Sequence, residues 1–309
     1  MKTKIDGTWF EFFHHSKVEG QYWNPQCRSF TEAQWRQMLD CIASSGMEYI
    51  VLMCSSLCYS DYAESYFPGG PYPFPEDMVC KNPMEVLMDE TSRLGLKVFM
   101  SCGFYGDWTK ARENMRDTDV RNRAFDAMER LNRLYGDYPS FYGWYLPDEI
   151  GIDGNFPQFF IDYVNDYRTY IRSLTPDKPL LIAPYGVAKI KFDEGFVEQL
   201  KSIDCEFIAY QDGVGIANGC VEIAEEAFRN LKAAHDAAGR SKLWADMEVF
   251  RFEGAAYRSA LIPADPARIS AQLAAISPYV EKILIYQYQG NLEHILTSNS
   301  TDFANTKCI

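Results

Sequence analysis

The chain has 309 residues, 47% of them hydrophobic and 15% aromatic, so it can bury a core large enough for one big or two ordinary domains. Its formal net charge of −13 argues against nucleic acid and anionic membranes as partners, because both select basic surfaces. No apolar run reaches the roughly 18 residues that a membrane-spanning helix needs.

The cysteines and the start of the chain indicate a compartment. Nine scattered cysteines, an odd number, favour reduced thiols over a disulfide framework. Met1–Asp6 leads into a strand without a secretory apolar segment. We therefore expect a cytoplasmic protein, or a periplasmic or secreted one if a signal peptide has been removed.

Strand-like apolar runs recur along the whole chain, and each is followed by a stretch of helical periodicity. They are Thr8–Phe13, Tyr49–Cys54, Lys97–Phe104, Phe141–Leu146, Pro179–Pro184, Cys205–Tyr210, Lys242–Val249 and Lys282–Tyr288. A spacing of roughly 40 residues is typical of an α/β protein built as a (β/α)8 TIM barrel.

The intervening stretches carry apolar residues three and four positions apart, as amphipathic helices do. The first begins after the N-cap Thr31, and the others cover about 83–94, 120–135, 157–174, 193–201, 221–238 and 266–280. Only Asn291–Ile309 follows the eighth strand, which predicts a short C-terminal stub in place of a full last helix.

A doubly wound open sheet is the main competing fold, since it also alternates strands and helices. It would normally carry a glycine-rich phosphate loop after the first strand, whereas this chain has His14-His15-Ser16-Lys17 there. With no internal linker either, we predict a single barrel domain over residues 1–309.

One connection is unusually long and aromatic. Ser55–Asn82, after the second strand, contains six Tyr and Phe residues around Pro68-Gly-Gly-Pro71. A long loop of this kind in a compact domain is usually functional, and its aromatic content argues against disorder. We expect it to form one wall of a cleft at the barrel mouth.

In this fold the catalytic side chains stand at the carboxyl ends of the strands. Here those ends carry acids, amides and aromatic residues in nearly every case. They are Glu11, His14, Tyr105, Asp107, Trp108, Trp144, Asp148, Glu149, Tyr185, Gln211, Asp212, Asp246, Glu248, Gln287, Tyr288 and Gln289.

The fourth strand ends in two adjacent acids. Burying Glu149 beside aromatic rings would raise its pKa and let it act as a general acid, although Asp148 and Glu149 could instead cap the following helix. On the seventh strand, Asp246 and Glu248 share a face, so at least one should point into the mouth. Two carboxyls across a cleft are the working parts of glycoside hydrolysis.

The segments Phe141-Tyr-Gly-Trp-Tyr-Leu-Pro-Asp-Glu149 and Ala209-Tyr-Gln-Asp-Gly-Val-Gly215 are similar to a family of bacterial glycosidase-like barrels known as a domain of unknown function. More broadly the chain resembles clan A glycoside hydrolases, whose acid/base Glu ends the fourth strand and whose nucleophilic Glu ends the seventh. The resemblance implies carbohydrate chemistry, with Glu149 as the acid and Gln211 and Asp212 in the cleft. It departs from the clan pattern at Asp148, where an Asn that binds the sugar 2-hydroxyl is usual.

The leading hypothesis is a glycoside hydrolase without metal or cofactor, in which Glu149 is the general acid and Glu248 the nucleophile or base. The other strand-end residues would bind the sugar: Glu11, His14, Tyr105, Asp107, Trp108, Trp144, Asp148, Tyr185, Gln211, Asp212, Gln287 and Tyr288. The loop aromatics would help to hold it. The sugar, the linkage, the stereochemical outcome, the exo or endo mode and the oligomeric state stay open.

Two other functions remain possible on the sequence. One is a catalytically silent barrel that binds carbohydrate, and the other is a metal-dependent isomerase or hydrolase using Glu149, Asp212, Glu248 and His14. Structural roles are also open for several residues: packing for the Tyr and Trp residues, an N-cap for Asp107, a turn for Asp212, and salt bridges for Glu11 and Glu248.

Overall fold

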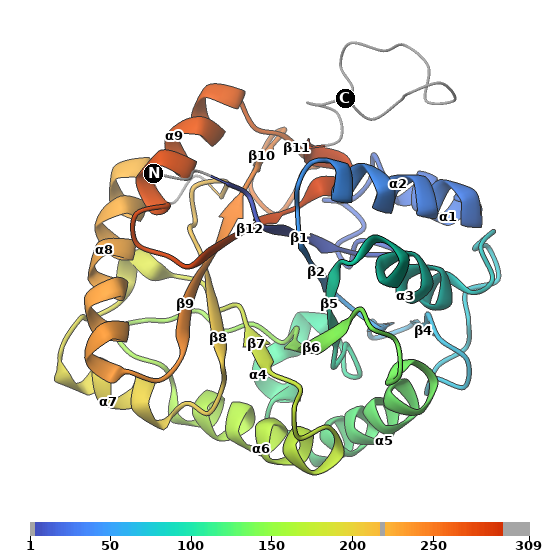
Figure 1. Cartoon of the computed structure of the whole chain (residues 1–309), viewed down its shortest axis with the longest axis horizontal. Coiled ribbons are helices and arrows are strands. Elements are labelled where there is room, and N and C mark those ends of the chain that lie inside the picture. Colours follow the sequence, from blue (N-terminus) through green and yellow to red (C-terminus); the bar gives the residue numbers. More distant parts are fainter. Residues whose placement is uncertain (1–3, 217–219, 293–309) are drawn as a thin grey trace.

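The computed structural model describes residues 4–216 and 220–292, and its centre is a closed barrel of eight parallel strands (Figure 1). The strands are β1 (Gly7–Phe10), β2 (Tyr49–Leu52), β5 (Lys97–Ser101), β6 (Phe141–Leu146), β7 (Leu180–Ile182), β8 (Phe207–Gln211), β9 (Lys242–Glu248) and β12 (Lys282–Tyr286). Around the barrel the order is β1-β12-β9-β8-β7-β6-β5-β2, with β2 pairing back to β1. The eight predicted strands and the TIM-barrel class are confirmed.

Helices surround the barrel, one or more between successive strands. They are α1 (Asn24–Ser29), α2 (Glu32–Ser44), α3 (Pro83–Leu94), α4 (Ala111–Asn114), α5 (Thr118–Tyr135), α6 (Gln158–Leu174), α7 (Glu194–Ser202), α8 (Val221–Ala238) and α9 (Pro266–Ile276), with short turns η1 (Trp108–Lys110), η2 (Val187–Lys189) and η3 (Tyr288–Leu292). Thr31 caps α2 in a capping box with Gln34, as its sequence predicts. No helix in the two described ranges is long and apolar enough to cross a membrane.

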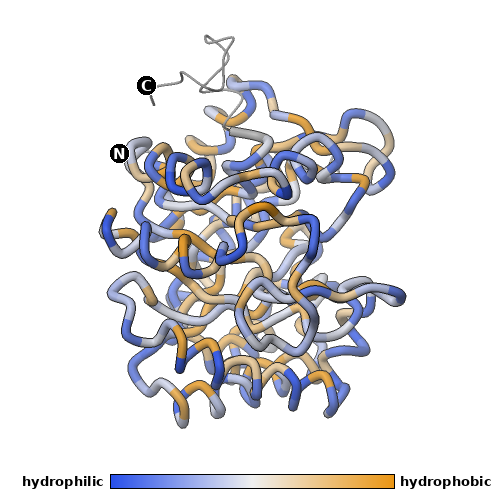
Figure 2. The backbone as a smooth tube through the Cα atoms, turned by 90° about the vertical axis from the view of Figure 1, so that its right-hand side faces the viewer, coloured by the Kyte–Doolittle hydropathy of each residue, from blue (hydrophilic) through white to orange (hydrophobic). Residues whose placement is uncertain are grey.

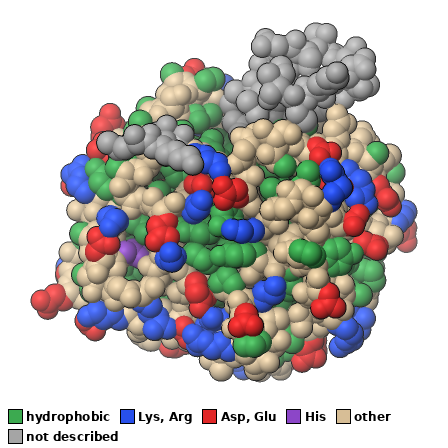
Figure 3. All heavy atoms as spheres, viewed as in Figure 1, with side chains coloured by type: hydrophobic (Ala, Val, Ile, Leu, Met, Phe, Trp, Pro, Cys, Tyr) green, Lys and Arg blue, Asp and Glu red, His purple; other side chains and the backbone are tan. Residues whose placement is uncertain are grey.

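Side chains fill the barrel interior. Every second residue of a strand points inward, and these positions carry large rings such as Trp9, Tyr145 and Trp244. Trp9 meets Tyr145 at 5.9 Å between ring centroids, and Trp244 meets Phe207 at 4.3 Å. Hydrophobic stretches accordingly run through the interior of the molecule in Figure 2, with hydrophilic stretches along much of its outer edge. Figure 3 shows hydrophobic side chains over the middle of one barrel face, with charged groups around them.

Two antiparallel hairpins extend from the barrel. The first, β3 (Ser56–Cys58) with β4 (Ala63–Ser65), lies in the connection after β2, and the second, β10 (Phe250–Phe252) with β11 (Leu261–Pro263), follows β9. The predicted C-terminal stub falls mostly on residues 293–309, outside the described ranges.

The Ser55–Asn82 connection folds differently from its expectation. Tyr66 and Phe67 turn into the core, where Tyr66 packs on Phe12 at 5.5 Å between ring centroids. These two rings belong to the large hydrophobic core between the barrel and its helices, and Tyr59, Tyr72 and Phe74 pack against it partly buried, so the loop buries apolar area there.

A buried carboxylate anchors this loop. Glu64 is 1% exposed and accepts two hydrogen bonds from the Arg28 Nη2 atom, at 2.6 and 2.8 Å. The hydroxyls of Tyr62 and Tyr66 also donate to Glu64. Arg28 in turn covers the ring of Phe13 at 4.1 Å, so one ion pair joins α1, the β3–β4 hairpin and the end of β1.

We expect Arg28→Met to reduce the free energy of unfolding by about 3 to 5 kcal/mol, because it leaves the Glu64 carboxylate buried without its cation. Arg121→Met is the matched control, since the Arg121–Asp166 pair is exposed and should cost less than about 1 kcal/mol. Denaturant unfolding of the two variants measures both values. Equal losses would contradict the anchoring role of the Arg28–Glu64 pair.

Candidate active site

A cavity of about 300 Å³ lies at the carboxyl ends of the barrel strands, and we call it the mouth cavity. Its lining comes from the ends of β2, β6, β7, β8, β9 and β12, the segment after β1 and the β10–β11 hairpin. The lining residues are His15, Glu19, Met53, Glu149, Tyr185, Gln211, Ile216, Asp246, Glu248, Phe250, Phe252, Tyr257, Leu261 and Tyr286. This is the end of the barrel at which the fold normally carries its chemistry.

The alternation of β9 brings two acids into the mouth cavity. Trp244 points into the barrel interior, so Asp246 and Glu248, two and four positions later, point the same way above it. In the sheet Asp246 stands opposite Gln211 of β8, and Glu248 opposite Tyr286 of β12.

Glu149 reaches the mouth cavity from the turn after β6 and is half-buried. Burial raises the pKa of its carboxyl to about 7, and the nearby charge of Asp148 acts in the same direction. Hydrogen bonds from Gln211 and Tyr145 oppose the shift, and the Tyr145 hydroxyl lies 3.3 Å from the Glu149 Oε1 atom. A carboxyl with this pKa is partly protonated at neutral pH and can donate a proton.

Glu248 is buried, and its Oε2 atom accepts a hydrogen bond from the Ile216 main-chain N–H at 3.0 Å. The nearby guanidinium of Arg268 donates to the carbonyl oxygens of Glu248 and Phe250, at 2.8 and 2.6 Å. Among the described residues no Lys or Arg forms an ion pair with the Glu248 carboxyl, so the salt-bridge role is not seen. Burial and then the charge of Asp212 raise the pKa of the Glu248 carboxyl.

Asp246 lies deepest of the three acids. It is 2% exposed, and its Oδ1 atom has no hydrogen-bond partner in the described structure. Burial, followed by the charges of Glu149, Glu248 and Asp212, raises the pKa of Asp246 well above its ordinary value. Three carboxyls in one buried space cannot all ionise without a strong electrostatic penalty.

Asp212 and Asp148, which the sequence assigned to sugar binding, do not line the mouth cavity. Asp212 accepts hydrogen bonds from the main-chain N–H groups of Val214 and Glu248 and from the Gln272 side chain at 2.6 Å. It holds the β8 turn against the end of β9. The Asp148 carboxylate accepts hydrogen bonds from the Tyr163 hydroxyl at 3.3 Å and from the Asn114 amide at 3.5 Å, two residues outside the lining of the mouth cavity.

Four further residues that were predicted to bind the sugar make contacts with other parts of the protein instead. The Trp144 indole donates to Thr175 at 2.9 Å behind the barrel wall, and the Tyr105 hydroxyl pairs with Ser55 at 2.8 Å. Asp107 caps η1 by accepting from the Thr109 N–H, and Tyr288 packs in the core. None of the four lines the mouth cavity, because each side chain is used between the barrel and its surrounding helices and loops.

Glu11, His14, Gln287 and Trp108 form a layer directly behind the mouth cavity. The Gln287 amide donates to Glu11 at 2.7 Å, and the His14 Nε2 atom lies 3.1 Å from the hydroxyl of Tyr286, which does line the cavity. Trp108 packs edge-on against the ring of His15 at 4.7 Å. These residues position the lining instead of forming it.

One possible metal-ligand atom from each of Glu11, His14 and His15 lies within 4.8 Å of the other two, a spacing that a metal ion could bridge. However, the two imidazoles are stacked at 4.5 Å with 16° between their planes. Ring nitrogens bind metals along directions in the ring plane, and the planes of stacked rings do not converge on one ion. The arrangement does not fit a metal site.

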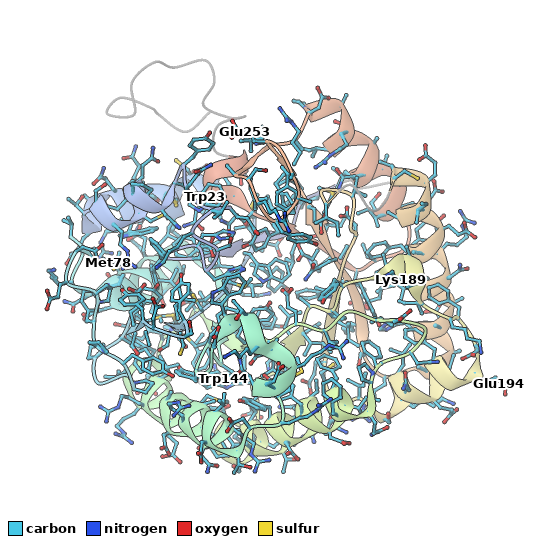
Figure 4. All side chains as sticks on the ribbon, turned by 180° about the vertical axis from the view of Figure 1, so that it is seen from behind. Trp23, Met78, Trp144, Lys189, Glu194 and Glu253 are labelled. Atoms are coloured by element: carbon cyan, nitrogen blue, oxygen red, sulfur yellow. The ribbon has the colours of Figure 1, made fainter. Side chains whose placement is uncertain are left out.

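The lining residues that sequence reasoning missed come mostly from loops. Tyr257, Phe252 and Leu261 belong to the β10–β11 hairpin, which supplies the wall expected from Ser55–Asn82. The Leu261 N–H donates to the Glu19 carbonyl at 3.0 Å, and the Tyr22 hydroxyl donates to Glu253, which lies near Trp23 in Figure 4. Asp246 was recognised as a strand-end acid on the same face as Glu248 but was not included in the predicted site, although both line the cavity.

Comparison with solved structures finds the same fold. A putative alpha-L-fucosidase from Bacteroides thetaiotaomicron superposes with a TM-score of 0.72 at 16% identity, over 96% of this chain and 88% of that one. A GH2 beta-galacturonidase from Eisenbergiella tayi gives 0.54 at 15%, over 92% and 44%. An endo-1,4-beta-mannanase from Rhizomucor miehei gives 0.54 at 11%, over 92% and 86%. These identities establish the barrel alone.

The comparison with curated proteins gives no match. The model of the domain of unknown function DUF4434, in contrast, matches residues 5–295 and so spans the whole barrel with its mouth cavity. The chain therefore belongs to the DUF4434 family.

Proposed function

We propose that this protein is a glycoside hydrolase acting on an oligo- or polysaccharide, with one barrel domain carrying the whole site. Glu149 acts as general acid, and Glu248 as nucleophile or as the base that activates water. The observation that carries the proposal is that both carboxyls line the same cavity at the ends of β6 and β9, with neither in an ion pair. A protonated and an ionised carboxyl across one cleft suit glycoside hydrolysis.

The surroundings of the two acids support different roles. Glu149 is partly exposed and keeps a proton near neutral pH, which it gives to the glycosidic oxygen as the bond to the sugar breaks. Burial and then the Asp212 charge raise the pKa of the Glu248 carboxyl to about 8, and the Ile216 N–H, which donates to its Oε2 atom, favours the ionised form against them. Glu248 either attacks the anomeric carbon or takes a proton from the attacking water.

The aromatic wall supplies the sugar-binding surface. Tyr185 and Tyr257 are 43% and 61% exposed at the rim, where their faces can stack on a sugar ring. Tyr257 also has a φ of 61°, which is unfavourable for a side chain of this size. Strained residues of this kind persist mainly at functional sites.

The two other functions have less support. A silent binding barrel would not need two unpaired acids in one cavity. The metal-dependent reading relied on Asp212 and His14, which lie outside the mouth cavity with their polar atoms used by protein groups.

Glu149→Gln and Glu248→Gln should each lower turnover of a natural glycan by about 10²-fold or more, because each removes acid/base or nucleophilic catalysis. A substrate panel of plant, host and microbial glycans, with released sugar as the readout, identifies the reaction. An aryl glycoside with a good leaving group separates the roles, since it needs no acid: Glu149→Gln should retain much of that activity and Glu248→Gln should not. Wild-type turnover by Glu149→Gln on the glycan would overturn the assignment.

Asp148→Asn should move the alkaline limb of the pH profile of kcat/KM to lower pH. The acid works while Glu149 is protonated, so activity falls as pH rises through its pKa of about 7. The Asp148 charge raises that pKa, and removing the charge lowers it. Asp177→Asn, an exposed change in the loop before β7, is the control and should leave the limb in place. An unmoved or raised limb in Asp148→Asn would count against Glu149 as the acid.

Tyr257→Ala should raise KM by up to about tenfold with little change in kcat, because a rim ring binds the substrate and the transition state alike. Steady-state kinetics on the substrate found in the panel measures both constants. Tyr257→Phe keeps the ring and should stay close to wild type. A selective loss of kcat in Tyr257→Ala would instead place this residue in the chemical step.

A further inference from the structure

The mouth cavity is acidic beyond what its proposed chemistry requires. Its described lining contains the carboxyls of Glu19, Glu149, Asp246 and Glu248, and it contains no Lys or Arg. Its one imidazole, His15, carries no charge at neutral pH, because burial lowers the pKa of that ring to about 4. Glycoside hydrolysis uses two of the carboxyls, so the role of the others needs a separate explanation.

Asp246 is the acid that the protein leaves without a partner. Its Oδ1 atom is buried in the lining without a hydrogen bond, an arrangement that costs free energy in the unliganded protein. The nearby donors are directed elsewhere. The Gln211 amide donates to the Ala183 carbonyl at 3.1 Å, the Arg268 guanidinium donates to main-chain oxygens, and the Gln272 amide donates to Asp212.

Asp246 thus lines the cavity without a hydrogen-bond donor at Oδ1 and without a basic side chain in the described lining, and a positively charged donor entering the cavity would favour its ionised form, which burial and the neighbouring acids disfavour. We propose that Asp246 is the counter-ion for an ammonium group of the substrate, so that the sugar bound in the mouth cavity is an amino sugar with a free amine. This inference rests on the proposed glycosidase function and names its substrate class. An ammonium offers three donors and pairs strongly with a carboxylate in a buried site.

The rest of the lining agrees with a cationic sugar. Tyr286 and Phe250 lie beside the acids with their rings 6.1 Å apart, and aromatic faces attract ammonium groups. A uronic acid or a sulfated sugar would instead bring a negative charge among four carboxyls with no basic side chain to receive it. The specificity of this chain should thus differ from the galacturonate named for the Eisenbergiella tayi enzyme.

The test compares sugars that differ at a single substituent. Dissociation constants of the wild-type protein are measured at pH 6.5 by ligand-observed NMR for three pairs: glucosamine and glucose, galactosamine and galactose, mannosamine and mannose. N-acetylglucosamine tests the charge, since it keeps the nitrogen without the ammonium, and glucuronate is the anionic probe. We expect at least one amine to bind tenfold or more tighter than its neutral partner, with glucuronate weakest.

Asp246→Asn should reduce that amine preference to near one, while Asp177→Asn, which removes the same charge at the opposite end of the barrel, should keep it. The wild-type comparison stands even if Asp246→Asn fails to fold. Absence of an amine preference in all three pairs, or a preference that survives in folded Asp246→Asn, would overturn the inference. If neutral sugars bind as tightly as amines, the amino-sugar inference is overturned but the hydrolase proposal is not. That proposal is tested separately, by the turnover of Glu149→Gln and Glu248→Gln.

Discussion

Closure of the parallel sheet is the constraint on which the rest of this structure depends. Because β1 pairs with both β2 and β12, every strand has two neighbours and every second side chain must face the barrel axis. Trp9, Tyr145 and Trp244 fill the inward positions through the middle of the barrel. The next inward positions, Gln211, Asp246 and Glu248, can only lie above this packed layer, at the carboxyl end. The packed interior thus sets the floor of the mouth cavity.

The surroundings of the site leave its carboxyls uncompensated. Arg268 donates to the main-chain carbonyls of Glu248 and Phe250 and forms no ion pair with the Glu248 carboxyl, and Asp212 accepts the Glu248 N–H while its other oxygen accepts from Gln272. The Glu248 carboxyl is held by the Ile216 main-chain N–H and that of Glu149 by the side chains of Tyr145 and Gln211, and neither is held by an opposite charge. Such an arrangement sacrifices stability for pKa values near neutrality, which is a common exchange at catalytic sites. Glu64, outside the cavity, differs from these acids because its buried carboxylate is paired with the Arg28 guanidinium.

The barrel fold and the proposed chemistry rest on different evidence. Superposition on glycosidases at 11 to 16% identity establishes a shared architecture, which many unrelated activities use. Glu149 and Glu248 in one cavity support the proposal of hydrolysis, and the unpartnered Oδ1 atom of Asp246 supports the proposal of an amino sugar. Because the chain belongs to the DUF4434 family, the proposed roles of these acids can also be tested in other members of that family.

Local sequence was enough to determine the fold class. Strand runs, helix caps such as Thr31 and the 40-residue rhythm are encoded by neighbouring residues, and the strand ends that carry Glu149, Gln211 and Glu248 follow directly from them. Which strand-end residues turn toward the cavity was decided only by tertiary packing. Asp148 and Asp212 are adjacent to lining residues yet face Tyr163 and Gln272, while the wall comes from the hairpin after β9 and not from the aromatic loop after β2. Side-chain direction in a turn depends on partners distant in sequence, and so the strand pattern identified the acids while the closed barrel selected which of them share the cavity.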